Sequence, residues 1–329
     1  VQAAELAAEG LTGARDILGD PQGFLRRFAK KPLDFVFSGY GSAWVTESLT
    51  FKIYPGCAYI DTAVDATLRI MKSFEEKHGR PLRAGEVKSV HVKASLLTIG
   101  MEALSAMYSD RSALSPITVN FSVGLSLALL LLDGALRPEA LSRENLAARK
   151  AEILSLADRV SLEHDVDLSH AMGGLESIGI DLRKFLWVGL EKLDVGGAAA
   201  SLDPSLAAVL LSAPEESRRS SRDRSGDEDA DAPTLDGVSF EKFRMAFPAE
   251  VKLVTEGDEY YTERQDVPLG GAGRPHEETS ALVRKKFVES ASPVLGEKPA
   301  LRALEQIDHF EEIDSIATFV RSLCRRRKR

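Results

Sequence analysis

The longest strongly apolar stretch of the chain, Phe121 to Leu132, limits what this sequence can fold into. Asn120 and Asp133 bracket it. A membrane-spanning helix needs roughly 20 consecutive apolar residues, so this stretch is too short to cross a bilayer. A helix that is hydrophobic on all sides is normally buried within a protein core. The stretch therefore predicts a buried helix in a soluble, globular protein.

Composition narrows the class of protein further. The chain has 329 residues, 44% of them apolar, which is enough for one large or two ordinary domains. Its two cysteines, Cys57 and Cys324, exclude a disulfide framework and the usual cysteine-ligated iron–sulfur cluster. Residues 1–10 have no signal-peptide pattern. We therefore expect an intracellular protein, cytoplasmic or mitochondrial.

The net charge of −8 argues against a broad nucleic-acid-binding surface. One basic element stands out, the run from Arg325 to Arg329 at the end of the chain. A terminal run of this kind is more often a solvated end than a targeting or phosphate-binding element, and both interpretations remain open. We expect no nucleic-acid partner and no membrane.

Periodicity predicts a mixture of helices and strands. Asp61 can cap a helix that starts at its own position, and Gly79 follows the end of that helix. Val87 and Lys88 are out of phase with the alternation that follows them, which leaves the start of the first strand uncertain. The predicted elements are an initial helix near 3–9, an extended run 49–54, a helix 61–77, a strand 89–94, an apolar helix after Ser115-Pro116 that ends at 133, a helix 143–157, a strand 159–164, a hairpin 250–255 and 259–264, and helices within 280–326. The predicted fold class is α+β.

One region departs from this pattern. Residues 213–236 are rich in Arg, Asp and Glu and have almost nothing to bury, which predicts disorder. The preceding residues, 171–211, are helix-forming but glycine-rich, and no role follows from them.

Several segments, taken in order, resemble the MmgE/PrpD family, which includes 2-methylcitrate dehydratase and cis-aconitate decarboxylase. No single segment is specific, but the collinear set covers nearly the whole chain except about residues 171–237, which resemble an insertion. The segments are the Ala-rich start with Gly10-Leu11-Thr12-Gly13, Gly23-Phe24, Lys52-Ile53-Tyr54-Pro55-Gly56-Cys57, Asp65-Ala66, Phe121-Ser122, Leu132-Asp133-Gly134, Phe247-Pro248-Ala249, Glu256-Gly257-Asp258, Pro268-Leu269-Gly270 and Lys286-Phe287.

The resemblance implies an all-helical domain built from the two chain ends and an α+β lid domain between them. Residues 1–47 and 279–329 would be pieces of the helical domain, and 48–276 would be the lid. We expect the N-terminal half of that fold to be missing from this chain. The family also implies a homodimer, or here a partner that supplies the helical half, with the site between helical domain and lid. Its members eliminate water or carbon dioxide from small polycarboxylates without a cofactor, so we expect no cofactor and no metal.

Lys52 matches the lysine that the family places in its active site, where an ammonium group can hold a carboxylate and stabilise developing negative charge. The alternative is a solvent-facing lysine at the end of a strand. Cys57 stands where relatives have Cys or His, so it can line a substrate pocket, although a buried structural thiol is the favoured interpretation.

Two positions depart from the family pattern. Asp61 stands where relatives commonly have His; a carboxylate there would repel a tricarboxylate and would not replace imidazole near neutral pH, so a helix cap is favoured over substrate binding. Leu125 stands where relatives have an active-site hydroxyl. Both departures weaken the prediction of an enzyme.

Two further patterns carry little. His164, Asp165, Asp167 and His170 superficially resemble a metal cluster, but their spacing favours solvent-facing polar residues. The glycine-rich run 270–273 lacks the strand and helix of a phosphate-binding loop and predicts a turn.

Three hypotheses remain. The first is a lyase acting on a small carboxylic acid by dehydration or decarboxylation, with Lys52 as catalytic residue and with Cys57 and Asp61 binding substrate. The second is a catalytically inactive family member that serves as a binding or assembly module. The third is a truncated, aggregation-prone product without a function of its own.

Overall fold

The computed structural model describes residues 2–28, 39–42, 44–108, 110–172 and 238–324. Two compact units are present, one made of residues 1–45 with 213–240, and the other of 46–212 with 241–329. The predicted insertion at 171–237 and its predicted disorder at 213–236 lie almost entirely outside the described residues. The predicted division of the chain at residues 47 and 276 stays a prediction.

The first unit contains two described α-helices, α1 (Gln2–Ala8) and α2 (Phe24–Phe28). Gly10 follows α1 with φ of +93°, the left-handed conformation that ends many helices. This agrees with the predicted stop. Neither helix has a fully buried residue.

The second unit is built on a mixed four-stranded sheet of order β2-β1-β3-β4. Strands β1 (Val87–Ala94) and β2 (Val160–His164) are parallel, whereas β3 (Ala249–Thr255) pairs antiparallel with both β1 and β4 (Tyr260–Gln265). The register between β1 and β3 shifts between Val87 and Ser89, where the sequence pattern was already out of phase. The predicted hairpin is confirmed, and Asp258 in its turn has a φ of 60°.

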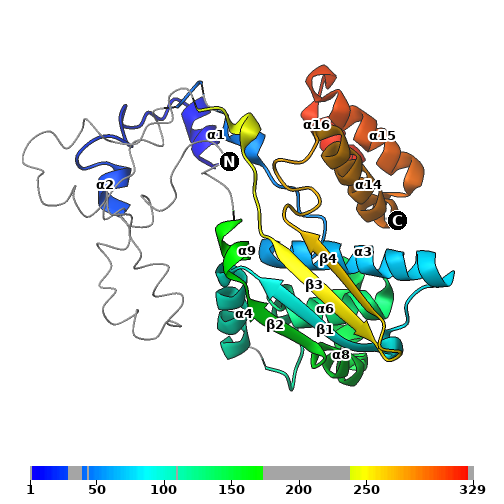
Figure 1. Cartoon of the computed structure of the whole chain (residues 1–329). Coiled ribbons are helices and arrows are strands. Elements are labelled where there is room, and N and C mark those ends of the chain that lie inside the picture. The colour runs from blue at the N-terminus through cyan, green and yellow to red at the C-terminus, as the bar shows by residue number, and fades with distance from the viewer. Residues whose placement is uncertain (1, 29–38, 43, 109, 173–237, 325–329) are drawn as a thin grey trace, which may run out of the picture. The chain divides into compact units, whose positions relative to one another are not determined.

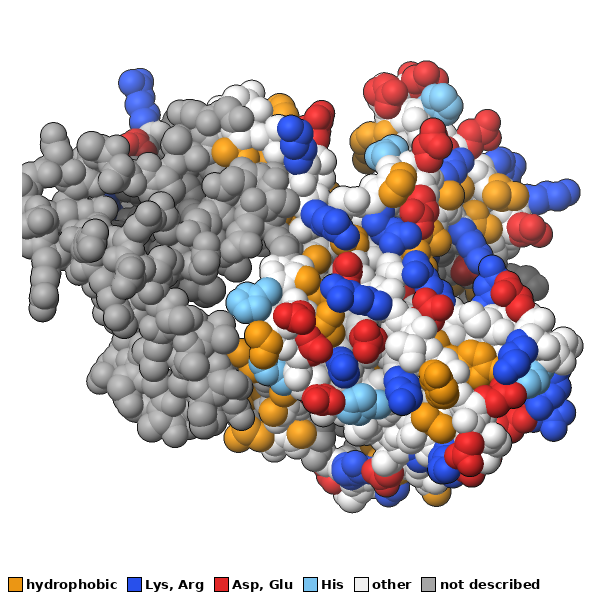
Figure 2. Space-filling model, viewed as in Figure 1, with side chains coloured by type: hydrophobic (Ala, Val, Ile, Leu, Met, Phe, Trp, Pro, Cys, Tyr) orange, Lys and Arg blue, Asp and Glu red, His pale blue; other side chains and the backbone are white. Residues whose placement is uncertain are grey.

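Helices cover one face of this sheet. In Figure 1, α3 (Asp61–His78) runs behind β3 and β4, and α6 (Val123–Asp133) lies next to it and reaches β2. The opposite face presents side chains such as His91, Lys93 and Lys252, and Figure 2 shows charged and histidine side chains scattered over this region. Successive side chains of a strand point to opposite faces of the sheet. Val90, Val92 and Leu253 point to the face that the helices cover, and all three are fully buried.

The apolar stretch that predicted a buried helix does form one, since every residue of α6 from Val123 to Leu131 is buried. It begins later than expected. A short separate helix, α5 (Pro116–Asn120), precedes it, and Ser115 and Ser122 each cap one of the two helices. No helix in the described parts of the chain is long and apolar enough to cross a membrane.

The remaining described elements lie in the second unit or at its boundaries with the first. The predicted helix 143–157 is interrupted at Arg149 and forms α7 (Arg143–Ala148) and α8 (Lys150–Ala157). The predicted helices near the end of the chain are α14 (His276–Leu295), α15 (Glu297–Asp308) and α16 (Ile316–Ser322). The others are α4 (Leu96–Tyr108), α9 (Val166–His170) and the 3-10 helices Val45–Ser48, Ala58–Ile60, Ala84–Glu86, Pro138–Leu141, Phe240–Lys242 and Phe310–Glu312.

Residues 49–54 form no strand, and their described backbone pairing with a distant segment is between Phe51 and Gly270 of the loop before α14. One local prediction near the start of α3 is wrong. Asp61 is the first residue of α3 rather than its cap; Ile60 occupies the N-cap, and no side chain caps the helix there.

Candidate active site

The segment that carries Lys52 is held against the loop before α14. The N–H of Phe51 donates to the carbonyl oxygen of Gly270 at 2.9 Å, and the N–H of Ala272 donates to the hydroxyl of Thr50 at 3.2 Å. Gly270 has a φ of +77°, and a Cβ atom there would lie 2.4 Å from the Phe51 carbonyl oxygen. The close approach of these two segments therefore requires glycine at this position.

Asp65, one turn into α3, ties both segments to the helix. One carboxylate oxygen accepts from the Tyr54 hydroxyl at 2.6 Å, and the other accepts from the Leu269 N–H at 2.8 Å. Burial raises the pKa of Asp65, and burial together with the neighbouring Asp65 carboxylate raises the pKa of Tyr54. Sequence reasoning noted Asp65 as part of a motif but did not assign it this clamping role.

Asp61 lies at the N-terminal end of the same helix and is 2% exposed. Its Oδ1 atom is buried and has no hydrogen-bond partner. Burial is the largest influence on its pKa, which is raised to about 7; the charges of Lys52 and Lys286 oppose this rise, and Asp65 adds to it. Burial thus moves the pKa of this carboxyl group close to neutrality, and the role of Asp61 in substrate binding stays a prediction.

Two lysines influence Asp61 electrostatically. Lys52 is exposed and comes from the segment held by the loop, whereas Lys286 comes from α14 and donates from its ammonium group to the Lys52 carbonyl oxygen. Within the described part of the chain, neither ammonium forms an ion pair. The fold thus places Lys52 close enough to Asp61 to affect its pKa, and it adds Lys286, which sequence reasoning did not single out as a site residue.

Cys57 lies between these residues in sequence but contacts other parts of the unit. Its N–H donates to the Asn120 carbonyl oxygen at 2.8 Å, and its half-buried side chain packs against the hydrophobic core. The nearby Tyr59 hydroxyl donates to the Phe121 carbonyl oxygen at 2.7 Å, and burial, with the Glu102 charge, raises the pKa of Tyr59. A role for Cys57 in substrate binding stays a prediction.

A second buried carboxyl group, Glu102 on α4, faces the start of α6. It accepts from the Ser122 hydroxyl at 2.8 Å and from the Val123 N–H at 2.7 Å, while burial raises its pKa. Glu102, Ser122 and Leu125 are among the residues that line a cavity of about 320 Å³. Because both carboxylate oxygens of Glu102 are bonded to the helix start, this group serves to cap α6.

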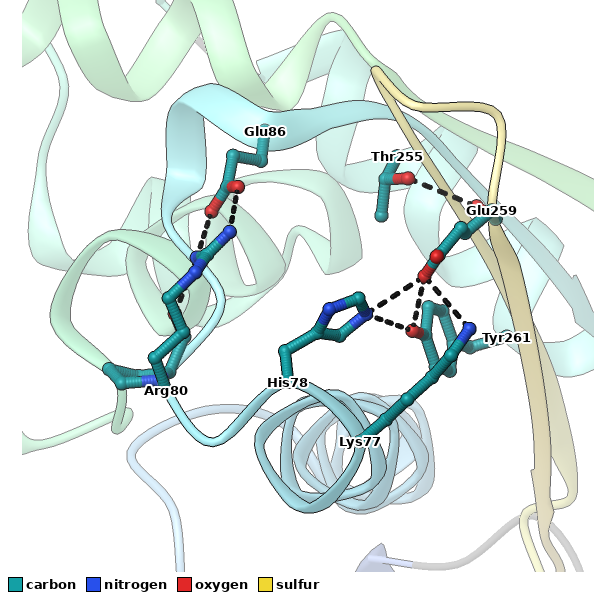
Figure 3. Close-up of polar contacts among 8 residues, drawn as sticks. Lys77, His78, Arg80, Glu86, Thr255, Glu259 and Tyr261 are labelled. Carbon is teal, nitrogen blue, oxygen red and sulfur yellow. Dashed lines mark hydrogen bonds and ion pairs between the residues drawn. The ribbon is translucent and has the colours of Figure 1, made fainter.

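The opposite end of α3 carries a polar cluster on the protein surface (Figure 3). Glu259 accepts from the Tyr261 hydroxyl at 2.8 Å, lies 2.9 Å from the His78 ring nitrogen and 3.1 Å from the Lys77 ammonium. These bonds lower the pKa of Glu259 to about 2. An ion pair between Arg80 and Glu86, with 2.6 Å between the guanidinium nitrogen and the carboxylate oxygen, lies beside the cluster. The cluster ties the β3–β4 hairpin to the end of α3.

The described residues contain no group of three or more His, Cys, Asp and Glu side chains that could hold a metal ion. Asp165, one of the residues that superficially resembled a metal cluster, caps α9 through the Leu168 N–H at 3.0 Å. The His164 ring lies 2.9 Å from the Ser169 hydroxyl. These contacts stabilise the local turn.

Comparison with known protein families gives a match over part of the chain. Residues 54–189 match the model of the MmgE/PrpD C-terminal domain, a range that includes Cys57, Asp61 and Asp65. No curated protein matches the chain.

Proposed function

Residues 54–189 make this chain a member of the MmgE/PrpD family through its C-terminal domain, and from this premise we propose that it acts as a lyase on a small polycarboxylate. The reaction is a cofactor-independent dehydration or decarboxylation. The observation that carries the proposal is the state of Asp61, a buried carboxyl group with a pKa of about 7 close to two lysines. Buried acid–base groups with a pKa near neutrality are characteristic of active sites.

Each residue has a role that follows from its chemistry. The Lys52 ammonium binds a carboxylate of the substrate and stabilises the negative charge that develops when a proton leaves the adjacent carbon or when carbon dioxide departs. Asp61 moves the proton. Near pH 7 both of its forms are populated, so the ionised form accepts a proton from carbon, and the protonated form donates one to a leaving hydroxyl or to a carbanion.

Tyr54, Asp65 and Gly270 act as positioning residues. They keep the Lys52 segment close to the first turn of α3, and the substrate atoms that react would lie between the Lys52 ammonium and the Asp61 carboxyl group. We further propose that the working assembly is a homodimer or includes a partner that supplies helical-domain residues.

The test is turnover of cis-aconitate and 2-methylcitrate by the protein purified from its native source. We expect turnover with kcat/KM that changes through a group titrating at about pH 7, and a loss of about 100-fold or more in Asp61→Asn and Lys52→Ala. Lys285→Ala is the matched control, because Lys285 is a neighbouring, exposed lysine on α14. Full activity in the Asp61→Asn variant would sink the assigned role.

The second candidate function is a catalytically inactive binding or assembly module. It is favoured by Leu125, an apolar residue that is 7% exposed at the position where relatives have a hydroxyl. The same assay separates the two functions, because a binding module would bind carboxylates without turning them over.

A further inference from the structure

The charges around Asp61 do not balance within the described part of the chain. Arg274, which acts electrostatically on the neighbouring Asp65, forms an ion pair with Glu278 at 2.6 Å. The Asp65 carboxylate already accepts from Tyr54 and Leu269. The ammonium groups of Lys52 and Lys286, by contrast, form no ion pair with any described carboxylate, although both lie close enough to Asp61 to lower its pKa.

The position of Lys286 shows where its free donors lie. An ammonium group has three N–H donors. One of them reaches the backbone carbonyl oxygen of Lys52, so the Lys286 ammonium is anchored at the segment that carries the first lysine. Close by, Oδ1 of Asp61 is buried without a partner, although buried polar atoms normally have one. Two cations with free donors therefore lie close to Asp61, whose protonated form supplies a further O–H donor, and together these donors form a place that an anionic ligand would complete.

We propose that Lys286 is a second carboxylate-binding residue of this site, so that the preferred ligand is a dicarboxylate with one carboxylate on Lys52 and the other on Lys286. The inference rests on the proposed function, in which Lys52 binds a carboxylate. It deepens that function by assigning the recognition of the second carboxylate to α14. A charge-assisted hydrogen bond to each ammonium would distinguish a dicarboxylate from a monocarboxylate of the same size.

The experiment is isothermal titration calorimetry near neutral pH with two matched probes. Succinate has two carboxylates, and succinamate has the same length with one carboxylate replaced by a neutral amide. We expect the wild-type protein to bind succinate about tenfold or more tightly than succinamate. Lys286→Met should reduce this ratio to about one, and Lys286→Arg should restore part of it.

Lys285→Met is the control for this series, because Lys285 is 72% exposed in its side chain and pairs with Glu289 on the same helix. It should leave the ratio unchanged. Thermal melts of the three variants verify that each is folded, so that lost binding is not lost structure.

Three results would overturn the inference. The wild-type protein could bind the two probes equally or not at all, Lys286→Met could keep the succinate preference, or it could weaken both probes by the same factor, which would mean that Lys286 only positions Lys52. Succinate has no hydroxyl to eliminate, so the measurement does not depend on turnover. A succinate preference without lyase activity would refute the proposed reaction and leave the two-lysine site standing.

Discussion

The two ends of helix α3 carry carboxyl groups in opposite states. At its first residue, Asp61 is buried, one of its oxygens has no partner, and its pKa is raised to about 7. At its last turn, about 25 Å away along the axis, Lys77 and His78 bind Glu259, whose pKa is lowered to about 2. A solvated carboxylate that accepts hydrogen bonds from several donors stabilises the structure. A desolvated carboxylate without a partner raises the free energy of the folded state, and protonation or a ligand that donates a hydrogen bond lowers it again.

The largest effect should come from removing the charge of Asp61. Its folded pKa lies above the ordinary value of 3.8, so the stability it contributes is complete below about pH 4 and is lost as the pH rises to about 7. Asp61→Asn should therefore raise the free energy of unfolding by up to about 4 kcal/mol above pH 7. Urea denaturation at several pH values measures this gain.

The groups that face Asp61 are Lys52, Lys286 and Asp65, and all three are retained in this variant. The gain should shrink steadily between about pH 7 and pH 4 because the wild-type carboxyl group becomes protonated in both states. A pH-independent difference between the two proteins would contradict the assignment.

A substitution that strains the backbone at Gly270 should give the second-largest change in the free energy of unfolding. Gly270→Ala places a Cβ atom 2.4 Å from the Phe51 carbonyl oxygen at a φ of +77°. The expected cost is about 3 kcal/mol, because backbone strain adds to the clash. Gly79→Ala is the control, since Gly79 has a similar φ of +68° but open space around it; it should cost only about 1 kcal/mol. Equal costs would show that the loop does not depend on this close approach.

Removing the hydroxyl of Tyr54 should have an intermediate effect. Tyr54→Phe leaves the buried Asp65 carboxylate with the Leu269 N–H as its remaining described donor, at a cost of about 1 to 2 kcal/mol. Tyr260→Phe, at a side chain on the exposed strand face, should leave the midpoint of denaturation unchanged. If both variants unfold at the same denaturant concentration, the hydrogen bond from Tyr54 to Asp65 contributes nothing to stability.

The smallest effect should come from Glu259→Gln at the surface end of α3. The folded pKa of Glu259 is depressed, so its contribution is present above its ordinary value of 4.5 and is lost as the pH falls to about 2. The melting temperature should fall only slightly near neutral pH, because solvent screens the cluster, and by less in acid, where the wild-type carboxylate becomes protonated. Glu289→Gln, in an exposed pair with Lys285, is the comparison variant. A larger drop than for Tyr54→Phe would reverse the ranking of the two ends.

How much of this could be predicted from sequence depends on how local the signal is. The burial of α6 follows from an uninterrupted apolar stretch, and the register shift at Val87 follows from residues out of phase with the strand. The breaks at Phe121 and Arg149 were not predicted, because no proline or glycine stands at either position. The pairing of residues 50–53 with a loop was also missed, since a short extended run has the same pattern in either setting.

The sequence by itself determined the α+β class, the buried apolar helix, the hairpin and the segment that carries Lys52 and Asp61, because each rests on the chemistry of neighbouring residues. Only the tertiary structure decided the surroundings of these two residues. Lys286 contacts Lys52 from a helix far along the chain, and the surrounding residues bury Asp61 away from solvent. Desolvation and charge act through space. An aspartate at the start of a helix can therefore be a solvated cap in one protein environment, whereas Asp61 in its buried environment has a pKa of about 7.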